Sequence, residues 1–295
     1  MAKKNSRHYP VVRKFSLSNG AAANTVVDTA RNLSVANRRL MRFGRYYEGK
    51  IDLRHDYAGP AIEVYVLRDD WAVQKAFQLA YQQYLDNTMD EREDMASNQV
   101  ARWEDFRVRH GLSLATQEAQ PVLHNAAGTA VVLSAGEFAL SNVTDAAGTE
   151  RTFTWGAAAA DRYSILVEYD KTDNTQNSSS SITADGAYSG IDADNQENTA
   201  DNLKTDGNAP PYDAGGVNAS SPWVRVAVLG GTAGTQKLSS GFFTAPCGLI
   251  LLKGYGGDDT NYSASLEVKA GDYKGVHAPS MVEVATVNRK RKVVK

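Results

Sequence analysis

Apolar and polar residues alternate in two segments near the start of the central part of the chain. These segments are YYEGKIDLRH at 46–55 and AIEVYVLR at 61–68. Their apolar positions are Tyr47, Ile51, Leu53, Ile62, Val64 and Val66. Because successive side chains of a strand point to opposite faces, each segment can bury one face against a core. Pro60 interrupts the pattern, so we expect two consecutive antiparallel strands.

Short apolar segments separated by turn residues follow in the second half of the chain. They lie at 128–135, 137–143, 151–155, 162–170, 223–230, 237–244, 247–255 and 262–270. The alternation is most regular in RYSILVEYD, at Tyr163, Ile165, Val167 and Tyr169, and again in YSASLEVKA. Together with the first pair they give about eight to ten strands, which predicts a mainly β fold.

Two helices are predicted between the first strand pair and the later strands. Asp69 or Asp70 can cap the first helix, whose cap requires a short polar side chain. Its apolar stripe is formed by Val73, Phe77, Ala80 and Tyr84. Thr88 and Glu91 have the spacing of a capping box for the second helix. Its apolar face is formed by Met95, Trp103 and Phe106. We therefore expect a helical insertion over 69–111.

A further amphipathic helix is predicted within 24–45. Val26, Leu33 and Leu40 recur there at heptad spacing. The basic residues on the opposite side are Arg31, Arg38, Arg42 and Arg45. Such a helix can bind a polyanion, pack on a neighbouring subunit or lie on a lipid surface, and the pattern leaves all three open.

The net charge of −2 conceals a strong separation of charge along the chain. Residues 1–50 hold eleven basic and two acidic residues, a net charge of +9. Residues 286–295, which include NRKRKVVK, hold five basic and no acidic residues, a net charge of +5. The part between them holds sixteen basic and thirty-two acidic residues, a net charge of −16. Basic ends can neutralise phosphates without reading sequence, whereas the acidic body would be repelled by the same polymer.

A long polar segment at 171–222 has almost no large apolar residue. It cannot offset the entropy of its ordering by burial, so we expect a surface loop. The predicted organisation is a basic N-terminal arm with its helix at 1–45, a β domain at 46–285 and a basic C-terminal tail at 286–295. The N-terminus lacks the apolar region of a signal peptide, and the longest apolar run is too short for a membrane span, so we expect a soluble protein.

No arrangement of residues in the sequence indicates catalysis or a cofactor. The five histidines are scattered, and no phosphate-binding or nucleophile motif occurs. Cys247 is the single cysteine; it is predicted to be a small buried hydrophobic residue. A calcium site formed by Asp192, Asp194 and Glu197 is a weak candidate, because the spacing lacks the glycine and the distant glutamate of an EF-hand. We expect neither an enzyme nor a bound cofactor.

The layout of a basic arm, two strands, a helical insertion and further strands with one long loop resembles the coat proteins of small icosahedral viruses. The run IEVYVLRDDWAVQKAFQLAYQQY, followed by ARWEDFRVRHG, is also similar to capsid sequences of small tailless viruses and phages with single-stranded genomes. The resemblance implies an eight-stranded jelly-roll β-sandwich, with a double jelly roll as the alternative.

The resemblance also implies a function. It implies a major capsid protein of the virion, made in the host cytoplasm or nucleus, that assembles into an icosahedral shell. Its partners would be other copies of the chain, the viral genome and minor capsid proteins. The residues expected to contact phosphates are Lys3, Lys4, Arg7, Arg13, Lys14, Arg31, Arg38, Arg39, Arg42, Arg45, Arg289, Lys290, Arg291 and Lys292. The alternative is a β-sandwich module that binds a receptor or a glycan through the 171–222 loop.

Overall fold

The computed structural model describes most of the chain between residues 10 and 281. The described residues are 10–18, 24–53, 61–95, 103–112, 117–136, 138–145, 147–173, 222–230, 237–254 and 262–281. Within them the protein is mainly β, and two antiparallel sheets form its centre.

The first of these sheets contains six strands among the described residues, in the order β12-β3-β14-β1-β6-β7. The strands are β1 (Lys14–Leu17), β3 (Tyr46–Leu53), β6 (Pro121–His124), β7 (Ala130–Val132), β12 (Phe243–Pro246) and β14 (Ala264–Val268). All of its neighbouring pairs are antiparallel, and the register places Ile51 opposite Leu266.

The second sheet contains five described strands in the order β11-β4-β13-β2-β5. The strands are β2 (Asn24–Asp28), β4 (Ile62–Leu67), β5 (Gln117–Glu118), β11 (Trp223–Leu229) and β13 (Leu249–Gly254). β5 runs parallel to β2, and the other pairs are antiparallel. The strands β1, β2, β3 and β4 lie alternately in the first and the second sheet, and so do β12, β13 and β14.

The two sheets pack face to face on one hydrophobic core. β3 alternates strictly between half-buried and buried residues, so the predicted apolar face is confirmed. Ile51 of the first sheet and Val64 and Ile250 of the second are fully buried in this core. The alternation in β3 is therefore a direct consequence of the sandwich, because the face that bears Tyr47, Ile51 and Leu53 is the one that packs in the core between the sheets.

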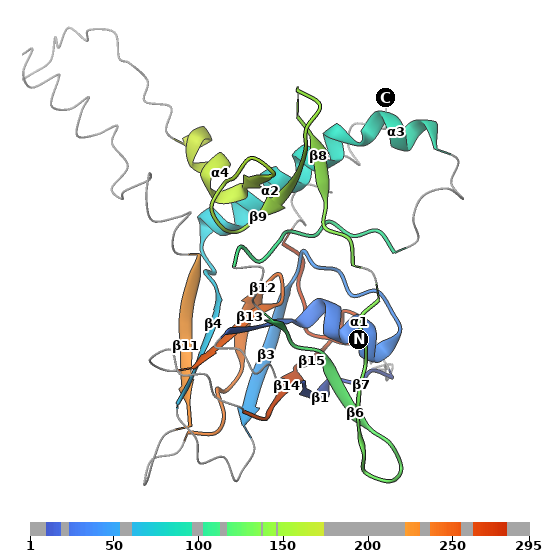
Figure 1. The fold of residues 1–295 in the computed structure, drawn as a ribbon, viewed down its shortest axis with the longest axis vertical. Helices are drawn as coiled ribbons and strands as arrows, with labels where there is room; N and C mark the ends of the chain where they lie inside the picture. Colours follow the sequence, from blue (N-terminus) through green and yellow to red (C-terminus); the bar gives the residue numbers. More distant parts are fainter. Residues whose placement is uncertain are drawn as a thin grey trace, which may run out of the picture.

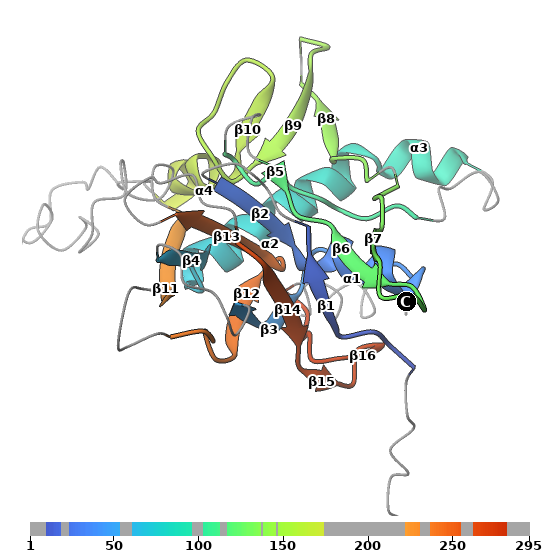
Figure 2. The same cartoon turned by 60° about the horizontal axis from the view of Figure 1, so that its bottom comes forward.

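The outer face of the second sheet is covered by elements of the connection between β4 and β11 (Figures 1 and 2). These elements are α2 (Trp71–Asn87), α4 (Ile165–Asp173) and a three-stranded sheet of β8 (Asn142–Thr144), β9 (Glu150–Thr154) and β10 (Arg162–Ser164). Phe77 of α2 stacks parallel to Trp155 at 6.3 Å and contacts Phe106 edge-on at 5.3 Å. This second core fastens the insertion to the sandwich.

The first predicted helix of the insertion is confirmed, but the second is much shorter than expected. Asp70 caps α2, because its side chain accepts a hydrogen bond from the backbone of Val73. The second helix is only α3 (Met89–Asp94), and residues 103–110 form neither a helix nor a strand apart from an isolated bridge between Arg109 and Thr154. Thr88 directly precedes α3, as the capping box predicted for the start of this helix, and its hydroxyl donates to the Tyr84 carbonyl at the end of α2.

The prediction of a helix within 24–45 is also wrong at both ends of this range. Residues 24–28 form β2, and only α1 (Thr29–Asn37) is helical. Asp28 caps α1 by accepting from the backbone of Arg31, and Arg38 ends it in the left-handed conformation. Val26 is buried by strand pairing in β2 rather than on a helix stripe. Both β1 and β2 belong to the sandwich, which therefore begins well before residue 46.

RYSILVEYD is the strand prediction that the structure overturns. Only β10 at its start is extended, and α4 follows from Ile165. The backbone of Val167 donates to the Ser164 hydroxyl at 3.5 Å, and Ile165, Leu166 and Tyr169 are buried in the core beside α2. Those three positions share one face of a helix, whereas in a strand Leu166 would point to the face opposite Ile165 and Tyr169.

Several other elements differ in extent from the predictions. The candidate at 128–135 shortens to β7, and those at 137–143 and 237–244 overlap β8 and β12 only at their last two residues. The candidates at 223–230, 247–255 and 262–270 contain β11, β13 and β14. A small hairpin of β15 (Ala270–Gly271) and β16 (Gly275–Val276) was not anticipated. None of the helices in the described ranges is long and apolar enough to cross a membrane.

Candidate nucleic-acid interface

Half of the residues that were predicted to contact phosphates lie in the described part of the chain. Seven of the predicted residues lie outside it: Lys3, Lys4, Arg7, Arg289, Lys290, Arg291 and Lys292. The other seven are Arg13, Lys14, Arg31, Arg38, Arg39, Arg42 and Arg45. The described residues differ in what their side chains contact, and this decides which of them can reach a partner.

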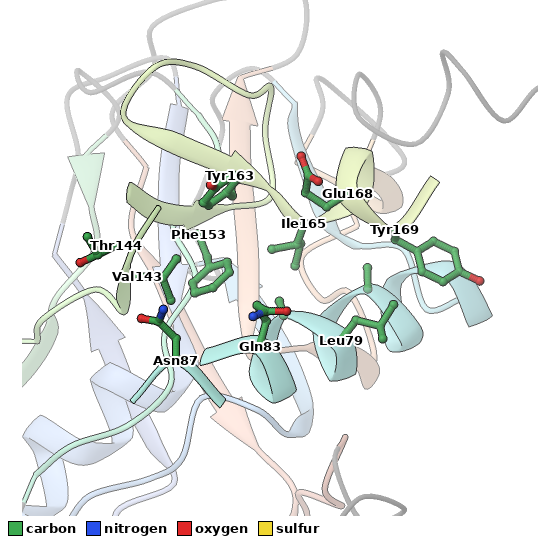
Figure 3. A pocket seen from close by; sticks show the side chains of 12 residues that line it. Leu79, Gln83, Asn87, Val143, Thr144, Phe153, Tyr163, Ile165, Glu168 and Tyr169 are labelled. Atoms are coloured by element: carbon green, nitrogen blue, oxygen red, sulfur yellow. The ribbon is translucent and has the colours of Figure 1, made fainter. Parts of the chain in front are cut away.

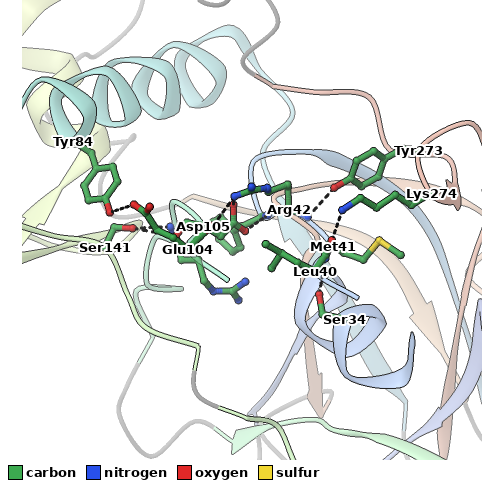
Figure 4. A network of polar contacts seen from close by, with 12 residues as sticks. Ser34, Leu40, Met41, Arg42, Tyr84, Glu104, Asp105, Ser141, Tyr273 and Lys274 are labelled. Atoms are coloured by element: carbon green, nitrogen blue, oxygen red, sulfur yellow. Dashed lines mark hydrogen bonds and ion pairs between the residues drawn. The ribbon is translucent and has the colours of Figure 1, made fainter. Parts of the chain in front are cut away.

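Arg42 connects separate parts of the chain (Figure 4), and so does Arg45. Arg42 Nη1 donates to the Glu104 carbonyl at 2.5 Å and lies 3.4 Å from Asp105 Oδ1. The backbone N–H of Arg42 donates to the Tyr273 hydroxyl at 3.1 Å. Arg45 Nη1 donates to the Ala278 carbonyl at 2.6 Å, and its guanidinium stacks 3.5 Å from the Tyr273 ring centre. Both arginines therefore have a structural role.

Asp105 is the buried carboxylate at the centre of this network. It accepts a hydrogen bond from the backbone of Phe43 at 2.7 Å. Burial raises the pKa of Asp105, although the hydrogen bond from Phe43 and the charges of Arg107 and Arg42 act in the opposite direction. The network thus holds the insertion against the segment that follows α1.

Arg38 and Arg39 are the arginines of this region with exposed side chains and no partner among the described residues. The backbone N–H groups of both donate to the Ser34 carbonyl as α1 ends. This backbone anchoring fixes where the two side chains start, while the guanidinium groups stay in solvent. They are the strongest described candidates for phosphate contact.

The two ends of the described chain meet the same basic segment, residues 37–46. At the N-terminal end, the backbone of Val12 donates to Asn37 Oδ1 at 2.7 Å, and Asn37 Nδ2 donates back to the Val12 carbonyl at 3.0 Å. At the C-terminal end, the backbone of Met281 donates to the Gly44 carbonyl at 3.1 Å. Sequence reasoning did not predict these contacts, because they join segments that are far apart in the sequence, 25 residues for Val12 and Asn37 and more than 200 for Gly44 and Met281.

Lys14 belongs to a separate cluster of charges across β1, β14 and β3. It lies 3.4 Å from Glu267 and 3.8 Å from Asp52, and Lys50 contacts the same two carboxylates at 2.9 and 3.1 Å. The hydrogen bond from Lys50 lowers the pKa of Glu267. Two lysines thus face two carboxylates, and this cluster has no net charge with which to attract a polyanion.

Arg31 lines a pocket whose other basic residues the sequence analysis missed. Its guanidinium pairs with Glu118, and the pocket also contains Arg107 and Arg109. The alternation in FRVRH at 106–110 places Phe106 and Val108 in the core beside α2 and the two arginines on the other face. The alternation of apolar and basic residues in this segment could have predicted the arrangement, but the segment was assigned to a helix instead.

A second pocket of about 410 Å³ lies between α2, the three-stranded sheet and α4 (Figure 3). Its side chains are mostly apolar or amide groups, with Glu168 as the one carboxylate among the lining residues. Tyr163 and Tyr169 lie over its upper side and Leu79 and Gln83 come from α2. A nucleophile with an adjacent base is not found among these lining residues, so this pocket offers no basis for a reaction.

The remaining candidate residues are also accounted for. Cys247 is fully buried beside Met281, 3.6 Å from its sulfur, and burial raises the pKa of its thiol; the predicted hydrophobic role is confirmed. The calcium candidates Asp192, Asp194 and Glu197 lie outside the described residues. Within the described ranges, no three histidine, cysteine or acidic side chains are grouped so as to hold a metal ion.

Comparisons of the chain with protein-family models, with curated proteins and with solved structures found no match.

Proposed function

We propose that the strands β1, β2, β3, β4, β11, β12, β13 and β14 form a jelly roll. In this fold a long antiparallel ribbon is rolled up, so that the first strand pairs with the eighth, the second with the seventh, the third with the sixth and the fourth with the fifth. The pairs β1–β14, β2–β13, β3–β12 and β4–β11 support the assignment. The short strands β5, β6 and β7 then belong to the excursion between β4 and β11, which favours a single jelly roll over a double one.

The function that we propose for this chain is that of a viral major capsid protein. Jelly rolls also occur in lectins and in small-molecule-binding domains, so the fold alone is not sufficient. The observation that carries the proposal is the meeting of both described ends with the basic segment 37–46. The chain on either side of the described part, with its basic residues, therefore starts from the segment that also bears Arg38 and Arg39. A shell protein needs positive charge on its inner side to hold a genome.

Exposed apolar residues at the sheet edges support self-association. Val131 and Val132 of β7 are 43% and 50% exposed, and Val224 of β11 is 45% exposed. Among the described strands, β7 lies at one edge of the first sheet and β11 lies at one edge of the second. An apolar strand at an edge can pair with another chain, which suits a protein that buries its edges in an assembly. A receptor- or glycan-binding module would give no role to the basic segment.

The proposal is tested by measuring the nucleic acid that copurifies with assembled particles. Replacing Arg38 and Arg39 by glutamine removes two charges without removing a side-chain contact in the described part of the chain. We expect less packaged nucleic acid and a shallower dependence of affinity on salt, by about two units in the logarithmic slope. A second variant, truncated after Asn288, should reduce packaging further.

The matched control is Lys237→Gln, which removes an exposed charge from the connection between β11 and β12. It should leave packaging unchanged. Equal packaging in the double arginine variant, the truncated variant and the wild-type protein would contradict the proposed contact with the genome, while particle formation would be judged separately by electron microscopy.

A further inference from the structure

A cationic pocket of about 470 Å³ lies where β2, the start of α1 and the segment 106–110 meet. Arg31 enters it from α1, and Arg107 and Arg109 enter it from the insertion. The acidic residues in its lining are Asp28 and Glu118. The pocket therefore lies between the sandwich and the insertion. Arg38 and Arg39 are not among its lining residues.

Two buried guanidinium nitrogens in this pocket have no hydrogen-bond partner among the described residues. Arg107 is 6% exposed and uses Nη2 to pair with Asp28 Oδ2, whereas its Nη1 donates to no group in the described part of the chain. Arg31 pairs with Glu118 through Nη1, and its buried Nε likewise has no partner within the described ranges. A buried donor without an acceptor is unfavourable, and such donors are uncommon in folded proteins. These two nitrogens are therefore suited to a ligand that brings its own acceptors.

The net positive charge of the pocket indicates that such a ligand is an anion. Three guanidinium groups face two carboxylates, and burial lowers the pKa of His110, which disfavours a further positive charge there. Burial also lowers the pKa of Arg31; the charge of Asp28 raises it, and the neighbouring charge of Arg107 lowers it further. The repulsion between these arginines would be relieved by an anion placed between them.

The aromatic lining favours a ligand with a planar or apolar part beside its anionic group. Arg107 lies between Phe43 and Phe138, at 5.0 and 4.9 Å from the ring centres, and Arg31 lies 5.4 Å from Phe138. These contacts hold the guanidinium planes in fixed orientations, which suits the paired donation that phosphate oxygens accept.

We propose that this pocket binds a phosphate group, with Arg31, Arg107 and Arg109 as its ligands. The phosphate can come from a free nucleotide or from a phosphodiester of a nucleic-acid strand. This inference goes beyond the proposed capsid function, because a phosphate site in the pocket would exist whether or not the chain assembles or packages a genome.

The test is calorimetric titration of the full-length protein, purified at high salt and transferred to phosphate-free buffer. The probes are inorganic phosphate, adenosine monophosphate and a short single-stranded oligonucleotide. Arg109→Gln should weaken binding of each bound probe about tenfold or more, as the loss of a charge-assisted hydrogen bond predicts. Arg109 is preferred to Arg107 for this variant, because loss of Arg107 leaves Asp28 buried without its partner.

Glu118→Gln gives a prediction of opposite sign. Glu118 competes with the ligand for Arg31, so its neutralisation should tighten binding by up to about fivefold, the usual range for an exposed ion pair. A merely structural role of the Arg31–Glu118 pair would not tighten binding. Lys237→Gln, which does not line the pocket, should bind all probes as the wild-type protein does.

The probes also identify the source of the phosphate. Tighter binding of the mononucleotide than of the oligonucleotide indicates a free nucleotide, and the reverse order indicates a strand. Absence of binding of all three probes at concentrations up to about 10 mM would overturn the proposal. It would also be overturned if Arg109→Gln and Glu118→Gln bound phosphate as the wild-type protein does.

Discussion

The Asp28 side chain caps α1 and also forms an ion pair with Arg107 of the insertion. Because substitutions can separate these two contacts, they test quantitatively how much the ion pair stabilises the packing of the insertion on the sandwich. Its Oδ1 accepts from the backbone of Arg31 at 2.8 Å and caps α1, and its Oδ2 pairs with Arg107. The side chains of the pair are only 10% and 7% exposed. Asp28→Asn keeps a good capping residue and removes the charge. Asp28→Ala removes both.

The expected magnitudes follow from these contacts. Asp28→Asn leaves the Arg107 guanidinium buried without its counter-charge, which should lower the free energy of unfolding by about 3–5 kcal/mol. Asp28→Ala should cost about 1 kcal/mol more, because the cap is lost as well. In the double variant Asp28→Asn with Arg107→Met neither charge remains, so the loss should fall short of the sum of the single losses by about 2 kcal/mol.

The assay is urea unfolding in phosphate-free buffer at one protein concentration, followed by the fluorescence of tryptophan. Trp155 belongs to the connection between β4 and β11 and is fully buried in the core that it forms with the second sheet, so its fluorescence should report the release of this connection. A loss below about 1 kcal/mol in Asp28→Asn, within the range of an exposed ion pair, would refute the view that a buried pair fastens the insertion. Additive losses in the double variant would refute the coupling.

Three further predictions concern other parts of the fold. Gly111 and Gly128 both have φ near +78°, at 78° and 77°, but a Cβ on Gly111 would meet the Gly156 backbone at 2.2 Å, whereas one on Gly128 would meet nothing within 4 Å. Gly128→Ala should therefore lower the free energy of unfolding by about 1 kcal/mol, and Gly111→Ala by at least about 2 kcal/mol, in the same urea assay; equal losses would contradict the contact. Because the folded pKa of Glu267 lies below its ordinary 4.5, the stability that it contributes is present above pH 4.5 and is lost as the pH falls through the folded value. The difference in unfolding free energy between the wild-type protein and Glu267→Gln should thus shrink on acidification, and a difference that grows would be contrary to the assigned shift. Cys247 is fully buried and its pKa is raised, so a thiol reagent should label it only in urea; rapid labelling of the folded protein would show that Met281 and its neighbours do not cover it.

Elements were predicted correctly where the spacing of apolar residues fitted only one type of secondary structure. β3 and β4 were predicted because each has a face in the core between the sheets, and α2 because its apolar stripe and its Asp70 cap agree. Residues 103–110 and helix α4 were assigned to the wrong class. The buried residues Phe106 and Val108 alternate as in an extended chain, whereas Ile165, Leu166 and Tyr169 share one face of a helix. In both segments tertiary contacts decide the local structure.

The candidate site was predictable in composition but not in geometry. Charge arithmetic identified the basic ends and the arginines of 31–45. It could not distinguish Arg42 and Arg45, which contact the insertion and the end of the chain, from Arg38 and Arg39, which remain in solvent. That distinction depends on contacts between segments far apart in the sequence, and a local pattern does not encode them.

The central claim is that this chain assembles into a closed shell, and electron microscopy of the purified full-length protein tests it most directly. After expression without any viral genome, negative staining at physiological salt should show closed particles of uniform diameter. A persistent small monomer under the same conditions would contradict the account.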